Sequence, residues 1–253
     1  MHRFFVNLDQ INDRKVSISG EDFKHITKVL RLKKGESIEV CAGRGLDYLL
    51  VLDAPMDGTI IGTITETTAS KGENSDIDVT LFQGLPKGSK MEVIIQKAVE
   101  LGVNRIVPFQ SMRSISQIKE KKDKKIERWQ RIAYEAAKQS KRGIIPLIGE
   151  LVDLSDILQN EKPFDLLLLA YENEKRQSLK EVLTNFAPAV TREKPLKIGV
   201  IIGPEGGFDP QEVNQCQLAL VKSISLGNRI LRTETAGMVV LSQLNFWREG
   251  QHA

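Results

Sequence analysis

Residues 197–213 read KIGVIIGPEGGFDPQEV, and this stretch indicates the fold class of the second half of the chain. Its first residues are mostly β-branched and favour a buried strand, which the glycines at 203–207 end. Asp209, Pro210 and Glu212 then supply a helix N-cap, a first-turn proline and a capping-box glutamate. A strand that runs through a glycine turn into a helix is typical of α/β domains, which bind ligands beyond the carboxyl ends of their strands.

A second stretch, SISLGNRILRTETAG at 223–237, repeats this arrangement. It predicts a short strand, a charged loop and an apolar helix that begins near Thr233. Two such loops from neighbouring strands would form one pocket with apolar walls and backbone donors and acceptors, which suits an adenosine-like ligand. The plainer alternatives are a tight turn without a ligand and an ordinary ion pair between Arg232 and Glu234. The first loop, IGPEGGF, matches neither a P-loop nor a GxGxxG fingerprint, which disfavours a phosphate cradle there.

The whole chain has the composition of a globular protein without membrane spans. It has 253 residues, of which 41% are hydrophobic and 27% charged, and two domains are the expected organisation. The N-terminal residues lack a signal-peptide core, and Cys41 and Cys216 suggest no disulfide framework, so a cytoplasmic location is expected. The three histidines are too scattered to predict a metal site.

The order of the predicted elements changes near residue 70. Strand-like runs and one helix, predicted at 19–32 with Ser19 as its cap, indicate a small β-barrel module at 1–70, followed by a polar linker at 71–76. From 77 to 253, strands and helices alternate, as in an α/β domain with a largely parallel sheet. The predicted strands cover 77–82, 104–109, 164–170, 197–202 and 222–226, and the predicted helices cover 88–101, 123–140, 210–220 and 233–247.

Positive charge is concentrated in one part of the chain. Residues 1–72 carry ten basic and ten acidic side chains, whereas residues 113–142 carry eleven basic and four acidic ones. Such an excess is what a surface facing RNA phosphates needs, although a solvated helix face explains it equally well.

Four motifs together resemble the RsmE family of ribosomal RNA methyltransferases, which methylate N3 of a uridine in 16S rRNA of the small ribosomal subunit. They are KGSKMEVIIQKAVELGV at 87–103, WQRIAYEAAKQSKR at 129–142, IGPEGGF at 202–208 and LGNRILRTETA at 226–236. The resemblance covers nearly the whole chain. It implies an N-terminal PUA-like RNA-binding barrel, a SPOUT-type α/β domain with a deep trefoil knot, a homodimer, and S-adenosylmethionine as cofactor, with no metal.

The resemblance also implies a role for particular residues. Three loops would hold the cofactor, largely through backbone groups, and they contribute Ala170, Tyr171 and Glu172, then Ile202, Gly203, Pro204, Glu205 and Gly206, and then Leu226, Gly227, Ile230, Leu231 and Arg232. Arg232 and Glu234 are the candidate catalytic residues. A guanidinium would stabilise the uridine anion, and the carboxylate would orient the guanidinium or accept the proton. The expected RNA contacts are Lys87, Lys90, Arg113, Lys138, Gln139, Lys141 and Arg142.

Two other functions stay open at this point. The chain could be a non-catalytic protein that binds ribosomal RNA during assembly, although the retained glycines of both loops argue against a degenerate pocket. It could also be a knotted methyltransferase that modifies a ribose 2′-hydroxyl instead of a base.

Overall fold

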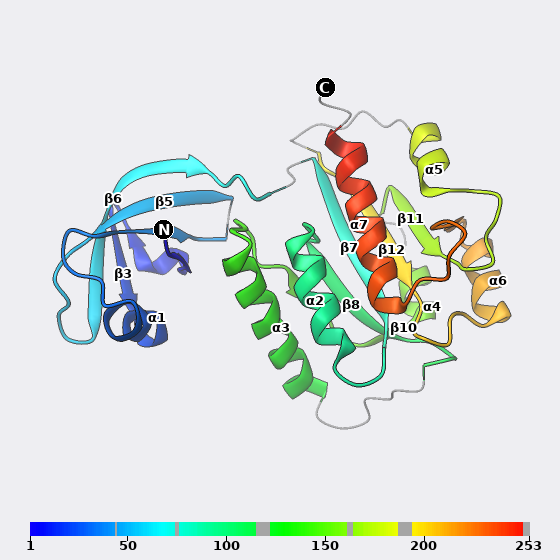
Figure 1. The fold of residues 1–253 in the computed structure, drawn as a ribbon, viewed down its shortest axis with the longest axis horizontal. Helices are drawn as coiled ribbons and strands as arrows, with labels where there is room; N and C mark the ends of the chain where they lie inside the picture. Colours follow the sequence, from blue (N-terminus) through cyan, green and yellow to red (C-terminus); the bar gives the residue numbers. More distant parts are fainter. Residues whose placement is uncertain (44, 74–75, 115–121, 161–163, 187–193, 250–253) are drawn as a thin grey trace. The chain divides into compact units, whose positions relative to one another are not determined.

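The protein is described from a computed structural model that covers residues 1–253, with residues 44, 74–75, 115–121, 161–163, 187–193 and 250–253 left undescribed. The chain divides into two compact units (Figure 1). Unit 1 contains Met1–Glu73 together with Ala137–Ile145, and unit 2 contains Asn74–Ala136 together with Pro146–Ala253. The segment 137–145 thus groups with the N-terminal unit, although the sequence pattern places it in the second domain.

Unit 1 is built around a six-stranded sheet with the order β1-β4-β5-β6-β3-β2. The strands are β1 Arg3–Phe5, β2 Ile11–Asn12, β3 Lys15–Ser19, β4 Ser37–Cys41, β5 Leu46–Leu52 and β6 Thr59–Ala69. Strands β1 and β4 are parallel, and the other neighbours are antiparallel. Alternate residues of β3 are buried, so one face of the strand packs into a cluster of aliphatic side chains.

The helix expected at 19–32 is shorter and less regular than its sequence suggests. Helix α1 covers Gly20–Lys24 and continues as a π-helical segment at His25–Val29. Ser19 stands at the N-cap position, but its side chain makes no capping hydrogen bond. The apolar face predicted for this helix, Phe23, Ile26, Val29 and Leu30, is formed only in part. Ile26 is buried in the aliphatic cluster with Phe23 and Leu30 against it, whereas Val29 is 67% exposed.

Unit 2 has a parallel sheet, which confirms the α/β class. Its order is β10-β8-β7-β12-β11-β13, and β9 also pairs with β8. The strands are β7 Ile77–Gly84, β8 Arg105–Gln110, β9 Leu147–Ile148, β10 Val152–Asp153, β11 Leu166–Ala170, β12 Leu196–Ile202 and β13 Lys222–Ile224. The helices are α2 Lys90–Glu100, α3 Lys122–Gln139, α4 Leu154–Gln159, α5 Leu179–Asn185, α6 Pro210–Leu218 and α7 Thr233–Glu249. Strand order alone does not decide chain threading, so the trefoil knot stays a prediction.

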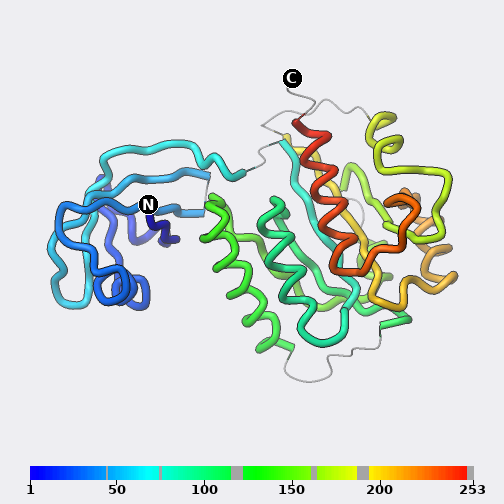
Figure 2. Tube along the Cα trace, in the orientation of Figure 1, coloured from blue at the N-terminus to red at the C-terminus, as the bar shows by residue number. Residues whose placement is uncertain are grey.

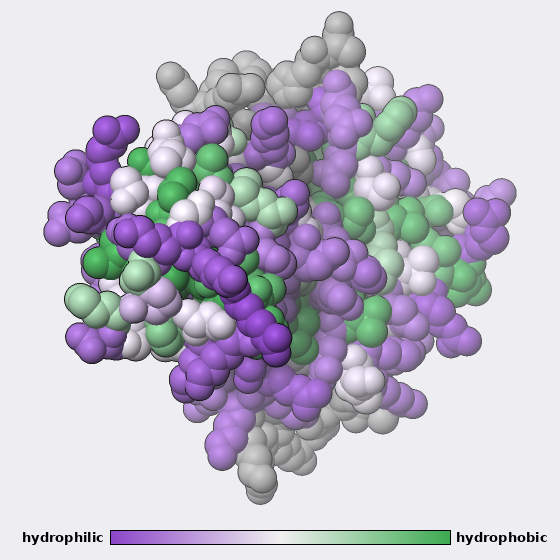
Figure 3. All heavy atoms as spheres, turned by 60° about the vertical axis from the view of Figure 1, so that its left-hand side comes forward, coloured by the Kyte–Doolittle hydropathy of each residue, from purple (hydrophilic) through white to green (hydrophobic). Residues whose placement is uncertain are grey.

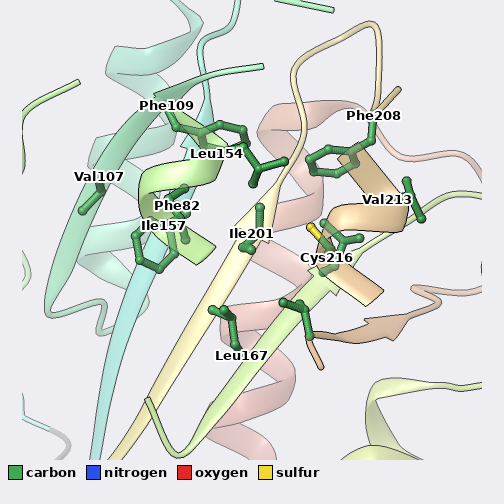
Figure 4. Close-up of a cluster of buried hydrophobic side chains, with 12 residues drawn as sticks. Phe82, Val107, Phe109, Leu154, Ile157, Leu167, Ile201, Phe208, Val213 and Cys216 are labelled. Carbon is green, nitrogen blue, oxygen red and sulfur yellow. The ribbon is translucent and has the colours of Figure 1, made fainter. Parts of the chain in front are cut away.

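Helices cover both faces of this sheet. Helix α7 packs on α2 and lies against β7 and β12, where a Cβ atom built at Gly237 would lie 3.7 Å from Leu81 and 3.9 Å from Ile202. Helices α4 and α6 cover the opposite face, where Figure 4 shows Leu154 and Val213 gathered with Ile201 of β12. Ile201 and Ile202 thus face opposite helix layers, as neighbouring residues of a strand must.

Three further features concern the helices, the surface and the cysteines of the described chain. None of these helices is long and apolar enough to cross a membrane. Hydrophilic side chains are spread widely over the face drawn in Figure 3, with hydrophobic ones in small groups between them. Cys41 and Cys216 are both buried and free, and burial raises the pKa of the Cys216 thiol to about 12.

The segment 137–145 is held in unit 1 by a buried ion pair. Arg142 is 2% exposed, and its Nη2 donates to Glu73 Oε2 at 2.8 Å while its Nε donates to Oε1 at 3.1 Å. The backbone amides of Gly143 and Ile144 donate to the same carboxylate at 2.8 and 3.0 Å. Arg3 of β1 adds a hydrogen bond of 2.8 Å to the carbonyl of Arg142. One carboxylate therefore fixes the chain that follows α3.

We expect Glu73→Ala to lower the free energy of unfolding of unit 1 by about 3 kcal/mol, because it leaves a buried guanidinium without its carboxylate. Urea denaturation followed by hydrogen exchange of unit 1 amides measures this. Glu66→Ala, at an exposed carboxylate on β6, is the control and should change stability by no more than about 0.5 kcal/mol. Equal losses in the two variants would contradict the role given to the ion pair.

Candidate active site

The two loops predicted from the sequence line adjoining cavities at the carboxyl end of the parallel sheet. They are called the first glycine loop, at 203–207, and the second glycine loop, at 226–232. The larger has a volume of about 380 Å³ and lies between residues 202–208 and residues 230–236. The smaller, of about 90 Å³, lies against 225–231. Both are lined by Ala170, the last residue of β11, and by Glu172, which follows that strand. In Figure 2 the chain between β13 and α7 forms a compact loop that leads into the first turn of α7.

A hydrogen-bond chain through Thr233 ties the walls of the larger cavity together. Its hydroxyl donates to the carbonyl of Gly203 at 2.6 Å and accepts from Nε2 of Gln83 at 2.9 Å. Gln83 is 0% exposed and also donates to the carbonyl of Gly84 at 3.0 Å. The end of β7, the first glycine loop and the start of α7 thus meet at one hydroxyl. Gln83 was not among the site residues expected from the sequence. The feature that could have identified it is a polar side chain at the end of an otherwise mostly apolar buried strand.

Two glycines allow backbone segments to approach closely beside this chain. A Cβ atom at Gly84 would lie 2.6 Å from Cδ of Pro204, so only glycine lets β7 come this near the turn. Gly207 has φ +65°, and a Cβ atom there would lie 2.7 Å from Oε1 of Glu172. The first glycine loop, at residues 203–207, therefore follows a left-handed turn directly beside a carboxylate from the loop after β11.

A buried carboxylate on α6 fixes the loop that follows β8. Oε2 of Glu212 accepts from the Ser111 hydroxyl at 3.0 Å and from the backbone amide of Asp209 at 2.9 Å, while Oε1 accepts from the amide of Met112 at 2.9 Å. This confirms the predicted capping box, and Asp209 also accepts from the amide of Gln211. The same carboxylate thereby holds Arg113 near Gly206, whose carbonyl lies 3.5 Å from the guanidinium.

A cluster of three charges, Lys90 with Glu205 and Glu234, stands at the edge of the larger cavity. Lys90 Nζ lies 2.9 Å from Glu205 Oε1 and 3.5 Å from Glu234 Oε2. The bond to Glu205 raises the pKa of Lys90. Burial tends to raise the pKa of Glu205, but Lys90 and nearby backbone amides outweigh it and hold that pKa below its usual value. Lys90, expected to contact RNA, is instead engaged with two carboxylates of the site.

The structure brings most of the expected cofactor residues together. Every one lines one or both cavities except Gly206, which packs against Arg113. The cavities are also lined by residues that were not among the expected cofactor contacts, namely Gly207, Phe208, Ser225, Asn228, Arg229, Thr233 and Ala236. Within the described chain, Arg232 is exposed and forms no ion pair, and Glu234 pairs with Lys90 instead. The expected Arg232–Glu234 contact is therefore not formed.

The expected RNA-binding residues fall into different environments. Lys87 is exposed, and its backbone amide donates to Glu205. Arg113 is exposed and also lies 3.4 Å from Asp209. Lys138, Gln139 and Lys141 belong to unit 1 and line a separate cavity there. The expectation for Arg142 is not met, because its guanidinium is buried against Glu73 and is not presented to a phosphate.

Two family models and several relatives match this chain. An RNA methyltransferase domain matches residues 73–245, and an RNA methyltransferase PUA domain matches residues 18–65. The ribosomal RNA small subunit methyltransferase E of Bacillus subtilis is 35% identical over 255 residues, which cover 98% of each chain. This chain belongs to the RsmE family. The resemblance read from the four motifs is confirmed, as is the combination of a PUA domain with a parallel α/β methyltransferase domain.

Solved RsmE-like structures share this fold. The RsmE of Neisseria gonorrhoeae, bound to S-adenosylmethionine, has 27% identity and a TM-score of 0.82 over 97% of each chain. A putative methyltransferase of Legionella pneumophila in complex with the same cofactor has 28% identity and a TM-score of 0.79 over 96% of each chain. Among the residues described for the present RsmE-family chain, no group of three or more His, Cys, Asp and Glu side chains could hold a metal ion.

We expect Thr233→Val to lower the free energy of unfolding of unit 2 by about 2 kcal/mol, because it leaves the buried amide of Gln83 and the carbonyl of Gly203 unsatisfied. Guanidinium denaturation followed by tryptophan fluorescence checks this, since both tryptophans, Trp129 and Trp247, lie in unit 2. Thr235→Val makes the same change on the same turn of α7 and should cost no more than about 0.5 kcal/mol. Indistinguishable costs would show that the hydroxyl does not join the loops.

The pairing of Lys90 with Glu205 should appear in the pH dependence of stability. Because the pKa of Glu205 is lowered in the folded protein, its contribution is present above the usual carboxyl pKa and is lost as the pH falls through the lowered value. We expect Lys90→Met to flatten this acid-side loss when the urea midpoint of unit 2 is measured from pH 3 to pH 8. Lys97→Met, on the same helix but paired with Glu100, should keep the wild-type slope, and a flattened slope in both variants would refute the assignment.

Proposed function

We propose that this protein is an S-adenosylmethionine-dependent methyltransferase that modifies N3 of a uridine in 16S rRNA of the small ribosomal subunit. One observation carries the proposal. The larger cavity lies between the two loops whose motifs characterise the RsmE family, and Thr233 links its walls by a hydrogen bond to Gly203. Its near full-length relative from Bacillus subtilis is named for the same activity class.

The residues of the larger cavity fit this cofactor. Its volume of about 380 Å³ lies in the range of small-molecule pockets. Ile202, Phe208 and Leu231 supply apolar walls, and the turns offer backbone donors and acceptors. The carboxylates of Glu172 and Glu205 also line it, and their negative charge suits a ligand that carries a sulfonium and an ammonium group.

Two side chains of this chain would act on the uridine. When bound, S-adenosylmethionine supplies an electrophilic methyl group. N3 must lose its proton to become nucleophilic, and the negative charge then spreads over O2 and O4 of the base. The exposed guanidinium of Arg232, which is free of ion pairs within the described chain, stabilises that charge. Glu234 is the proposed proton acceptor, since it follows Arg232 closely in the chain and its side chain stays 27% exposed while Oε2 lies 3.5 Å from Lys90.

The PUA unit and a homodimer complete the proposed assembly. A match to an RNA methyltransferase PUA domain supports an RNA-binding role for unit 1. The exposed lysines at the start of α3 add positive charge that favours phosphate contact. A dimer agrees with the large exposed apolar side chains of α7 and its preceding loop, Phe246 at 80% and Ile230 at 89% exposure.

The decisive experiment incubates the purified protein with labelled S-adenosylmethionine and small subunits that lack the N3 mark, and then identifies the methylated nucleoside by mass spectrometry. We expect 3-methyluridine. A 2′-O-methylated nucleoside would instead establish ribose methylation. Cofactor binding without transfer to subunits or free RNA would favour a non-catalytic role in ribosomal RNA assembly.

We expect Arg232→Ala to lower kcat for methyl transfer by about two to three orders of magnitude, because it removes the charge that stabilises the uridine anion. Cofactor affinity, measured by calorimetry, should change little if the side chain faces the base. Arg131→Ala is the matched control, since Arg131 is an exposed arginine on α3 outside both cavities, and its kcat should stay near the wild-type value. An unchanged kcat in Arg232→Ala would exclude this residue from the chemical step.

A further inference from the structure

A third cavity lies within unit 1, apart from the two that the glycine loops line. It has a volume of about 210 Å³ and forms where the end of α3 meets β1 and the π-helical segment. Its lining includes Arg3, Phe4, His25, Lys138, Gln139 and Lys141. None of the lining side chains carries a carboxylate, whereas several are hydrogen-bond donors. This lining favours a ligand that is anionic and accepts hydrogen bonds.

Not all of the positive charge at this cavity is already neutralised. Arg3 is buried and paired with Glu39 and Asp47, so its charge is balanced inside the unit. Lys138 lies over the ring of Phe4, 4.4 Å from its centroid, and is 3.5 Å from Asp22. Lys141 is exposed and has no ion-pair partner among the described residues. One lysine is thus partly balanced and the other is free to meet an anion.

Contacts within unit 1 position some of the groups that line this cavity. Lys141 adopts φ +57°, and it directly precedes Arg142, which Glu73 and Arg3 fix. The ring of His25 packs edge-on against Phe4, with their centroids 5.9 Å apart. The backbone that carries Lys141 and the ring of His25 are therefore positioned before a ligand binds, which lowers the entropy cost of binding.

We propose that this cavity binds a phosphodiester group of the RNA substrate, with Lys138 and Lys141 as its charged contacts and His25 and Gln139 as further hydrogen-bond donors. The volume is more than ten times the roughly 15 Å³ that one water molecule needs, so a phosphate with part of its nucleotide fits. The choice of RNA over a free phosphate rests on the proposed function. In this arrangement unit 1 contributes a defined phosphate subsite, and the face of α3 that carries Lys124 and Lys125 contributes only diffuse attraction.

The test compares two double variants that remove the same charge at opposite ends of α3. Lys138→Gln/Lys141→Gln alters the cavity, and Lys124→Gln/Lys125→Gln alters exposed lysines at the start of α3. Binding of in vitro transcribed 16S rRNA is measured between 50 and 200 mM salt. We expect the cavity variant to weaken binding about tenfold at the lowest salt and to reduce the salt slope by about two, and the control to change affinity less than about twofold.

Two further variants protect this result against a folding defect. The single variants Lys141→Gln and His25→Gln each remove one contact of the cavity. Because both side chains are exposed, we expect each variant to keep the wild-type unfolding curve while RNA binding weakens about threefold. Equal losses in the cavity and control double variants would overturn the proposal, as would full RNA affinity in the cavity variant.

A competition experiment separates RNA from free phosphate. Inorganic phosphate, added at constant ionic strength, should displace RNA from the wild-type protein only at millimolar or higher concentration. Displacement at micromolar phosphate, lost in the cavity variant, would assign the site to a free phosphate compound instead. RNA binding is measured without S-adenosylmethionine, so a protein that binds RNA through this cavity but transfers no methyl group would refute the proposed function and leave the subsite standing.

Discussion

The hydroxyl of Thr233 is the contact on which the candidate active site depends. It joins three segments that are distant in sequence, because it accepts a hydrogen bond from Gln83 and donates one to Gly203 at the first turn of α7. The close approach of Gly84 to Pro204 brings these segments within reach of each other. A single buried hydroxyl thereby sets the spacing of the two cavity walls, and the bonds are strengthened because water is excluded from them.

At the same edge of the sheet, charged side chains also link segments that are distant in sequence. Glu212 of α6 fixes the loop after β8, and Glu205 of the first glycine loop is held by Lys90 of α2. Each carboxylate belongs to one element and is satisfied by another, so the loops of the site are constrained from both sides. Arg232 differs, since it forms no ion pair within the described part of the chain. A cation left free beside a cavity that other ion pairs enclose is suited to meet a charge that develops on a substrate.

The sequence predicts the local structure of unit 2 well because that structure depends on local signals. The β-branched run before Gly203 forms β12, and Asp209 and Glu212 form the capping box that was read from their spacing. The short helices α4 and α5 were not foreseen, because a six- or seven-residue helix shows too little periodicity to be distinguished from a loop. The π-helical turn after α1 was not foreseen either, since residue spacing there is compatible with an ordinary helix.

The ion-pair partners of two cations could not be predicted from the sequence, because each partner is far away along the chain. Lys90 and Arg142 both look like surface cations in a basic chain, and only the fold brings Glu205 to the first and Glu73 to the second. A buried ion pair such as that of Arg142 contributes little net stability, because desolvation offsets most of the attraction, yet it strongly disfavours any arrangement that separates the charges. In unit 1 the ion pair therefore acts mainly by fixing where the chain after α3 lies. By fixing the chain after α3 against β1, the pair determines where Lys138 and Lys141 stand, and a cluster of lysines that the sequence shows only as excess charge becomes a cavity of defined shape.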